Sequence, residues 1–365
     1  MALELGGAES HVISLARELH RRGQRVVVAS AGGHLVEELT KLGIPHAHVP
    51  MDSRSPVEMA RAYFRLRRVI DTYRVGLVHA HARIPAFVSA LVLRGSRVPF
   101  VSTYHGVYAA GFPWRYLTRF GQRTIAVSED VRQHLIERLG APAKQVRLIP
   151  NGFDTELFHP GVDIAPLLTE FGVQASEPHL VSAGRLDDDL FEVPMSLVAA
   201  IPALERQIPG VRLWILGDGT RIADVRRAAE AMNRQLGRQA VVATGARRDV
   251  HRFFNLADCV VAVARTAVEA MACARPVVIA GQGGYRGLLT PERIEEYART
   301  NFTAREGGRP PSPELLEADI LRVLRQTDGS ELRRMGEAGR TYVVENLSID
   351  AITARILDVY AEVLS

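Results

Sequence analysis

Short apolar runs alternate with longer amphipathic segments along almost the whole chain. The apolar runs are rich in Val and Ile, which is typical of strands buried on both faces. The segments between them carry apolar residues at helical spacing. A strand that is buried on both faces needs helices above and below its sheet, so the alternation predicts an α/β fold of doubly wound parallel sheets.

The alternation occurs twice. The first run has predicted strands at 25–29, 47–49, 77–79, 100–103, 124–127 and 146–149, with helices at 9–22, 34–42, 57–72, from 85 and after 128. The second has strands at 179–183, 211–216, 240–243, 259–263 and 276–279, with helices at 197–207, 222–236, 250–256, 266–273, 314–324, 331–345 and 349–364. The pattern lapses near Pro160, Gly161 and Pro166. We therefore expect two Rossmann-like domains, residues 1–160 and 161–345, followed by a closing segment at 346–365.

The beginning of the chain departs from this pattern. A doubly wound domain opens with a strand that leads into its Gly-rich turn. Here only five residues precede Gly6 and Gly7. We expect either a stub strand or a chain shortened at its N-terminus, and we favour the second.

The composition is that of a globular protein, with 47% apolar and 24% charged residues. No apolar run approaches the roughly 20 residues of a spanning helix, and residues 1–7 lack the features of a signal peptide. Two cysteines, Cys259 and Cys273, cannot form a disulfide framework, and no Cys/His cluster has zinc spacing. These features predict a cytoplasmic protein without a bound metal.

Charge is distributed unevenly. Residues 1–160 carry 21 Lys and Arg against 13 Asp and Glu, whereas the remainder carries 24 against 28. Basic and aromatic residues also alternate in segments 57–72 and 112–120. This pattern suits an anionic partner, such as a phospholipid surface or a pyrophosphate-bearing substrate, and we expect no nucleic-acid partner. An arginine-rich genome, a solvated helix and a core-packed loop are the alternatives.

Candidate functional residues of the first half follow predicted strands, where ligands bind in open α/β sheets. Gly6 and Gly7 precede a helix whose free N–H groups could hold an anion, although a plain tight turn gives the same pattern. His105 could transfer a proton or bind a hydroxyl, and a structural histidine is its alternative. A further group of polar residues, His79, His81 and Arg83, could line an acceptor site with it.

The second half offers charged candidates. Arg185 carries a fork of donors suited to phosphate, and Asp187, Asp188 and Asp189 after it are expected to be a solvated helix start. Glu269 could accept both hydroxyls of a ribose, one turn into a helix that follows a strand. The start of that helix could bind a pyrophosphate, and two strand-end loops suit the base. The helix start comprises Arg265, Thr266 and Ala267, and the two loops comprise Gly217, Asp218 and Gly219, and Gly245, Ala246 and Arg247.

Several motifs, in this order, resemble the family 4 glycosyltransferases of GT-B fold. They are GGAES at 6–10, YHG at 104–106, AVSEDV at 126–131, IPNGFD at 149–154, SAGRL at 182–186, LGDG at 216–219, TGARRDV at 244–250 and VEAMACARPVV at 268–278. The resemblance covers nearly the whole chain. It implies two Rossmann-like domains facing a central cleft, with the last helix crossing back to the first domain.

The resemblance also implies a function. The C-terminal domain would bind a nucleotide-sugar, with UDP favoured, and the N-terminal domain a saccharide, lipid-linked or secondary-metabolite acceptor. Transfer would retain the anomeric configuration and need neither metal nor cofactor, because basic side chains and helix N-termini stabilise the leaving diphosphate. By position, Arg185 would contact the diphosphate, Glu269 the ribose, Gly7 the diphosphate from the other domain, and His105 the reacting centre.

Two positions depart from the family pattern. Many members have a second Glu where this chain has Val261, and many have a Lys where it has Leu190. We expect Arg247, Arg248 or Arg265 to supply the missing cation. Two other functions are compatible with the sequence: a degenerate protein that binds nucleotide or a partner without turnover, and a sugar-nucleotide epimerase of the same architecture.

Overall fold

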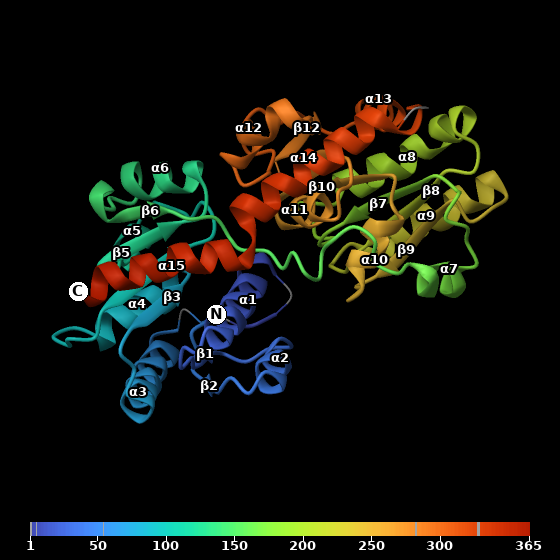
Figure 1. Cartoon of the computed structure of the whole chain (residues 1–365). Helices are drawn as coiled ribbons and strands as arrows, with labels where there is room; N and C mark the ends of the chain where they lie inside the picture. The colour runs from blue at the N-terminus through green and yellow to red at the C-terminus, as the bar shows by residue number, and fades with distance from the viewer. Residues whose placement is uncertain (1, 5, 54, 282, 327–328) are drawn as a thin grey trace. The chain divides into compact units, whose positions relative to one another are not determined.

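The structure is a computed structural model of the chain, and it describes all residues except 1, 5, 54, 282, 327 and 328. The chain divides into two compact units. Unit 1 comprises Met1–Asp154 and Asn346–Ser365, and unit 2 comprises Thr155–Glu345. The division therefore lies between Asp154 and Thr155 rather than after residue 160, and the C-terminal segment belongs to unit 1 (Figure 1).

Unit 1 contains two parallel sheets. One pairs β1 (Val28–Ser30) with β2 (His46–His48), and the other has the order β3-β4-β5-β6. Its strands are β3 (Val78–His81), β4 (Phe100–Tyr104), β5 (Arg123–Ala126) and β6 (Val146–Leu148). The helices are α1 (Gly7–Arg21), α2 (Val36–Lys41), α3 (Pro56–Tyr73), α4 (Arg83–Val92), α5 (Trp114–Leu117), α6 (Glu129–Glu137) and α15 (Ile349–Leu364), with a 3-10 turn at Ala143–Gln145.

The stub strand, which was the less favoured of the two alternatives, is absent from residues 2–4. Leu3 is buried, and its N–H donates to the Gly32 carbonyl at 2.6 Å while its carbonyl accepts from the Leu35 N–H at 3.0 Å. Both partners lie in the loop after β1 rather than in a strand. Unit 1 therefore has two separate parallel sheets among its described residues.

Unit 2 is built on one six-stranded sheet of order β12-β11-β10-β7-β8-β9. All neighbours are parallel except the edge strand β12, which runs antiparallel to β11. The strands are β7 (His179–Ala183), β8 (Arg212–Leu216), β9 (Val241–Gly245), β10 (Cys259–Ala262), β11 (Val277–Gly281) and β12 (Gly284–Leu288). The helices are α7 (Ala165–Phe171), α8 (Glu192–Gln207), α9 (Ile222–Leu236), α10 (Val250–Leu256), α11 (Ala264–Ala272), α12 (Ile294–Ala298), α13 (Pro313–Leu324) and α14 (Ser330–Leu347), with a 3-10 turn at Pro291–Arg293.

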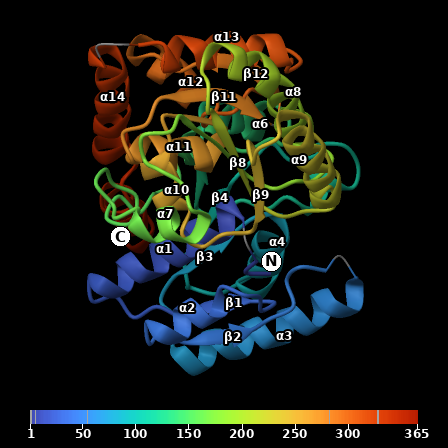
Figure 2. The ribbon, with the colours of Figure 1, turned by 90° about the vertical axis from the view of Figure 1, so that its right-hand side faces the viewer.

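Helices cover both faces of this sheet (Figure 2). Leu213 and Ile215 of β8 are fully buried in a cluster that includes side chains of α8, α9 and α13. Burial of each such side chain contributes about 1.5–3 kcal/mol, which explains why the Val- and Ile-rich runs form strands. Cys259 and Cys273 are buried free thiols.

The last helix completes the core of unit 1. Ile352, Ile356 and Val359 of α15 are buried in one cluster with Leu15 of α1 and Ile125 of β5. The helix begins at Ser348, whose hydroxyl accepts from the Ala351 N–H at 3.3 Å. Within the described residues, no helix is both long and apolar enough to cross a membrane.

Candidate active site

The predicted donor residues of unit 2 follow the carboxyl ends of neighbouring strands. β7 pairs directly with β10 on one side and with β8 on the other. Arg185 follows β7, and α11, which carries Glu269, follows β10. Because β7 and β10 are parallel neighbours, the segments that follow them leave the same edge of the sheet at adjacent positions.

Backbone contacts lock the loops at this edge together. The Gly184 N–H donates to the Leu216 carbonyl at 3.0 Å, the Leu186 N–H to Asp218 at 2.9 Å, and the Gly217 N–H to Gly245 at 2.9 Å. A Cβ at Gly217 would lie 1.8 Å from the Gly184 carbonyl oxygen, and its φ is +144°. Only glycine fits there. The loops after β7, β8 and β9 are therefore one rigid backbone surface.

Arg185 projects from this surface and is paired with acids. Its guanidinium lies 2.7 Å from an Asp187 carboxylate oxygen and 3.5 Å from one of Asp189, and 57% of the side chain is exposed. Asp187 also accepts from the Thr220 N–H at 3.0 Å, and this bond, with Arg185, lowers the pKa of the carboxyl. Asp188 pairs with Arg221 at 2.9 Å. The acidic run was predicted as a helix start; instead it joins two loops, and α8 begins later, at Glu192.

Glu269 is held within α11. Its carboxylate lies 2.7 Å from the Arg265 Nε one turn earlier, and the residue is buried. The helix begins without a side-chain cap after Val263, and Ala264 has a φ of +51°. Two N–H groups at this start already have backbone acceptors: that of Ala264 donates to the Phe302 carbonyl at 2.8 Å, and that of Ala267 to the Val263 carbonyl at 3.4 Å. The N–H of Thr266 is the candidate for an anion beside a carboxylate of fixed orientation.

Two of the three predicted substitutes for the missing cation, Arg247 and Arg265, have other partners. Arg247 forms ion pairs with Glu170 at 2.7 Å and Asp249 at 2.8 Å, which raise the pKa of its guanidinium, and Arg265 binds Glu269. Ala246, next to Arg247, is exposed. These pairs tie Arg247 to Glu170 of α7 and to Asp249, the residue that precedes α10.

The departing positions lie in different environments. Val261 is buried in the core of β10, with 1% of its surface exposed. Leu190 lines a cavity of about 430 Å³ together with Asp189, Glu192, the glycines after β11 and Arg309. A cation, Arg309, therefore lines the same cavity as the residue that stands in place of the family lysine. Arg309 could not be predicted as a candidate, because it is remote from every motif.

Unit 1 gathers histidines at the carboxyl ends of β3 and β4. His81 Nδ1 and His105 Nε2 lie 3.0 Å apart, and His105 Nδ1 lies 2.9 Å from the Asn151 side-chain oxygen. The amide oxygen only accepts, so His105 Nδ1 carries a proton. A neutral His105 then accepts at Nε2 from His81 Nδ1, and the lone pair of His81 lies at Nε2. The pair can pass a proton from one ring to the other.

Burial keeps these rings neutral. Desolvation lowers the pKa of His105 to about 4, against a smaller opposite effect of the Asn151 hydrogen bond. Desolvation also lowers the pKa of His81 well below its ordinary value, and the neighbouring histidines lower it further. The pKa of His79 falls to about 3 for the same reason. At pH 7 the cluster therefore presents uncharged imidazoles, which accept hydrogen bonds but do not keep an added proton.

The other predicted acceptor residues have structural contacts. Both ring nitrogens of His79 are engaged at 2.7 Å, Nδ1 with the Tyr360 hydroxyl and Nε2 with that of Thr103. Arg83 is buried, donates to the Ala109 carbonyl at 2.6 Å and lies over the rings of Tyr108 and Trp114. These contacts fix the position of the His79 ring, and the hydrogen bond from Arg83 stabilises the loop before α5.

The start of α1 lies in the same unit. Gly6 precedes the helix in extended conformation with no side-chain cap, and Gly7 is the first helical residue. One turn on, His11 is buried and its Nδ1 accepts from the Gly152 N–H at 3.0 Å. Its ring centre lies 5.6 Å from that of His105. Sequence reasoning missed His11 and the positioning residues Asn151 and Tyr360; the IPNGFD motif was the one available signal, for Asn151.

No group of three or more His, Cys, Asp or Glu side chains that could hold a metal ion occurs among the described residues.

Two family models match the chain in succession. Glycosyltransferase Family 4 matches residues 5–157, and glycosyl transferases group 1 matches residues 177–310. Together the matches span both units. The chain belongs to the family 4 glycosyltransferases of group 1.

Individual relatives of this glycosyltransferase are distant but cover its full length. A D-inositol 3-phosphate glycosyltransferase of Xylanimonas cellulosilytica is 26% identical over 98% of this chain and 92% of its own. A Rickettsia africae glycosyltransferase has a TM-score of 0.81 at 22% identity, covering 100% and 97% of the two chains. The Anabaena protein HepE, in complex with UDP, has a TM-score of 0.75 at 21% identity, covering 98% and 96%. These structures share the GT-B fold with this chain.

Proposed function

We propose that this chain is a retaining glycosyltransferase that transfers a sugar from a UDP-sugar to a cell-envelope, lipid-linked or secondary-metabolite acceptor. One observation carries the proposal: Arg185 and the uncapped start of α11, with Glu269 one turn in, leave adjacent parallel strands of one sheet. A guanidinium and a helix-start amide suit a diphosphate, and a carboxylate suits the hydroxyls of a ribose.

The donor would bind unit 2. Its diphosphate would contact Arg185 and the Thr266 N–H at the start of α11, and its ribose hydroxyls would donate to Glu269, whose orientation Arg265 fixes at 2.7 Å. The loops at Gly217–Gly219 and Gly245–Arg247 would line the base. HepE, which shares the fold, has been crystallised with UDP, which supports this class of donor.

The reaction would build negative charge on the leaving diphosphate. A divalent ion is not required if Arg185 and the start of α11 stabilise that charge. Arg185 must then exchange Asp187 and Asp189 for phosphate oxygens, since one guanidinium cannot satisfy all of them. Arg309, which lines the cavity beside Leu190, would provide a second positive charge.

Unit 1 would bind the acceptor and handle its proton. When the acceptor hydroxyl attacks the anomeric carbon, the glycosidic bond forms and the bond to the diphosphate breaks. The hydroxyl proton leaves with the diphosphate or a nearby base. A neutral His105–His81 pair, with a 3.0 Å contact between its rings, would position the hydroxyl and relay its proton to the leaving diphosphate, since a ring of low pKa does not keep a proton at pH 7.

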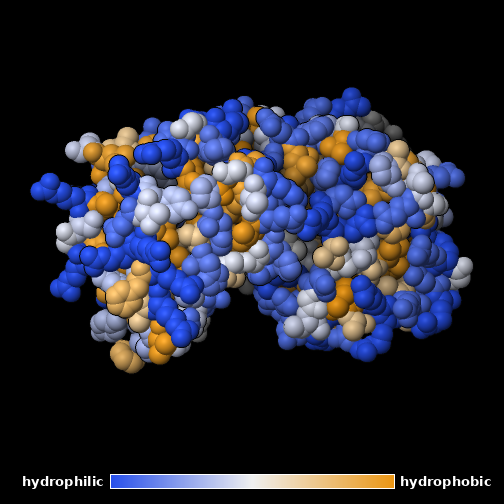
Figure 3. Space-filling model, turned by 90° about the horizontal axis from the view of Figure 1, so that it is seen from below, coloured by the Kyte–Doolittle hydropathy of each residue, from blue (hydrophilic) through white to orange (hydrophobic). Residues whose placement is uncertain are grey.

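We further propose a cytoplasmic protein in peripheral contact with the inner face of the membrane through unit 1. Phe64 of α3 is 70% exposed, and Phe112 and Tyr116 are 86% and 66% exposed. Figure 3 shows hydrophobic residues among strongly hydrophilic ones on the lower face of unit 1. Basic and aromatic side chains that are exposed together suit a bilayer interface with a lipid-linked acceptor.

The test is a donor panel. UDP-, GDP-, ADP- and TDP-sugars are incubated with the protein, with and without saccharide and lipid-linked acceptors and with and without EDTA, and nucleotide release is measured. We expect acceptor-dependent UDP release that survives EDTA, and a product whose anomeric proton, read by NMR, keeps the donor configuration. An inverted product contradicts retention. A new sugar formed without acceptor indicates an epimerase, and binding without any product indicates the degenerate protein that Leu190 and Val261 would favour.

A further inference from the structure

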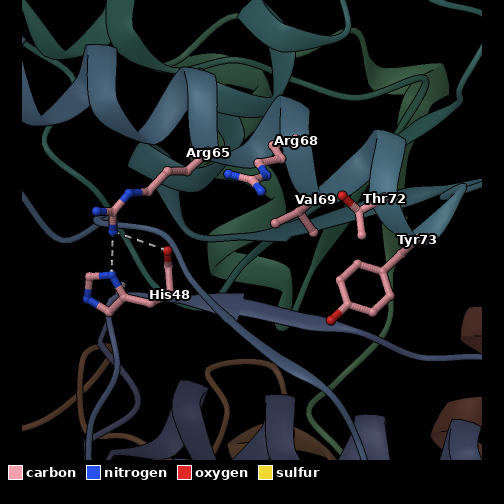
Figure 4. A pocket seen from close by; sticks show the side chains of 6 residues that line it. All are labelled: His48, Arg65, Arg68, Val69, Thr72 and Tyr73. Atoms are coloured by element: carbon pink, nitrogen blue, oxygen red, sulfur yellow. Dashed lines mark hydrogen bonds between the residues drawn. The ribbon is translucent and has the colours of Figure 1, made fainter.

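A basic pocket of about 250 Å³ lies on unit 1, between the end of β2 and the C-terminal half of α3. It is lined by His48, Arg65, Arg68, Val69, Thr72 and Tyr73 (Figure 4). None of these residues belongs to the donor loops or to the histidine cluster. All except Val69 are exposed, so the pocket is open to a ligand that is attached to something larger.

Positive charge and hydrogen-bond donors dominate the lining. Arg65 Nη1 donates to His48 Nδ1 at 2.8 Å and to the His48 carbonyl at 3.4 Å, which fixes the guanidinium at the edge of the pocket. Figure 4 shows the guanidinium of Arg68 directed to the same side as that of Arg65. Thr72 and Tyr73 add two hydroxyl groups. The lining contains no carboxylate.

Most other arginines near candidate sites are neutralised. Arg185, Arg247 and Arg265 each pair with a carboxylate, and on α3 itself Arg61 pairs with Glu58 at 2.5 Å. Among the described residues, neither Arg65 nor Arg68 forms an ion pair with a carboxylate. Asp71 lies one turn after Arg68 on the same helix, but it does not line the pocket, and no ion pair joins it to Arg68 within the described part of the chain. Two unneutralised guanidinium groups around one cavity call for an anion.

We propose that this pocket binds the phosphate group of a phosphate ester. A phosphate monoester carries nearly two negative charges and three acceptor oxygens, which match two guanidinium groups and two hydroxyls. The ester comes either from a phospholipid headgroup or from a soluble phosphorylated molecule, since both present the same group. Phe64, one turn before Arg68 on α3 and 70% exposed, adds an apolar side chain on the neighbouring turn, which suits a lipid as the source of the ester.

Binding is tested with two probes. Glycerol 3-phosphate is titrated by calorimetry, and phosphatidylcholine vesicles with and without phosphatidic acid are co-sedimented with the protein. We expect saturable binding of glycerol 3-phosphate, weakened about tenfold or more by Arg68→Ala and by Arg65→Ala, because each removes a charge-assisted hydrogen bond. Arg67→Ala is the matched control: Arg67 is exposed, lies next to Arg68 on α3 and does not line the pocket.

The outcomes separate the sources of phosphate. Loss of both glycerol phosphate and phosphatidic acid vesicle binding in Arg68→Ala, with Arg67→Ala unchanged, assigns the pocket to a headgroup. Loss of the soluble probe alone assigns it to a soluble ester. No saturable binding of either probe, or equal weakening by Arg67→Ala, overturns the proposal. Transfer activity of Arg68→Ala on a soluble acceptor is measured separately, so failure here is distinguishable from failure of the proposed transferase function.

Discussion

The two units bring polar side chains to the ends of their strands in opposite ways. In unit 2 the candidate residues are charged and paired: Arg185 is more than half exposed and binds two aspartates. In unit 1 they are half-buried imidazoles whose pKa values burial lowers, so they stay neutral at pH 7. A paired arginine must give up part of its contact with the aspartates when an anionic ligand arrives, whereas a neutral imidazole can hydrogen-bond a hydroxyl without a charged partner. The contrast matches the proposed function, in which the diphosphate binds unit 2 and the acceptor hydroxyl binds unit 1.

The largest expected effect tests the charged half of this contrast. Arg185→Ala should lower kcat about 10²–10³-fold, because one preorganised charge on the leaving group is lost in the transition state. The measurement is acceptor-dependent UDP release at saturating donor. Arg234→Ala, an exposed arginine in the last turn of α9, is the control and should leave the rate unchanged. Equal rates for wild type and Arg185→Ala would remove the arginine from the diphosphate site.

The neutral half is tested by His105. His105→Ala should lower kcat about 10²-fold, within the usual contribution of a positioned proton-transfer group. The pH profile is the sharper readout. Because the pKa of His105 lies at about 4, the neutral ring persists as pH falls, and kcat/KM should stay level from pH 8 to about 5 rather than fall near 6.5. If kcat/KM of the wild type instead fell as the pH dropped through about 6.5, and if this fall disappeared in His105→Ala, the ring would not be desolvated in solution.

The same shifts make unit 1 sensitive to acid. Such a histidine has a pKa of 6.5 in the unfolded chain and of about 3 or 4 in the folded protein. At a pH between these two values it is neutral in the folded protein and takes up a proton when the chain unfolds. Stability is therefore fully present above pH 6.5 and falls below it, by up to about 1.4 kcal/mol per pH unit for each such histidine. Urea unfolding at pH 7.5 and pH 5 measures the loss. His79→Gln, which can still hydrogen-bond Tyr360 and Thr103, should make the loss smaller.

Carboxylates would also make stability depend on pH, but in a lower pH range than the histidines. Glu18 binds Arg21 and Arg22, and these contacts lower its pKa to about 2. Its contribution is present above pH 4.5 and is lost only below that. If the free energy of unfolding fell only below pH 4.5, and if His79→Gln behaved like wild type, the histidines would not be buried in their neutral form.

The fold was largely predictable because long periodic segments and buried strands leave a strong pattern. The elements that were missed are short or irregular: β12 contains Gly284 and Gly287 and lies at a sheet edge, and α5 has one turn. The division of the unit 1 strands into two separate parallel sheets, seen among its described residues, was not predicted, because strand pairing depends on tertiary packing rather than on local pattern.

Positions of candidate residues were easier to predict than their partners. Parallel strands bring their carboxyl ends to one edge, so His105, Arg185 and Glu269 could be placed from local sequence. Their neighbours come from elsewhere in the chain: His11 and Asn151 meet His105, and Tyr360 meets His79. Such contacts depend on tertiary packing, and local periodicity carries no information about them.

The smallest expected effect concerns the acids that hold Arg185. Asp187→Asn removes the charge yet keeps an oxygen that can accept from the Thr220 N–H, so the loop geometry should survive. The Arg185 guanidinium would then lose no ion pair with residue 187 when a diphosphate binds. UDP should therefore bind up to about fivefold more tightly, which is the size of effect expected for an exposed ion pair. Calorimetric titration with UDP measures this, with Asp188→Asn as control because Asp188 pairs with Arg221 instead. Weaker UDP binding in Asp187→Asn would mean that the aspartate positions Arg185 rather than competing for it, and the charged edge of unit 2 would then be as preorganised as the histidines of unit 1.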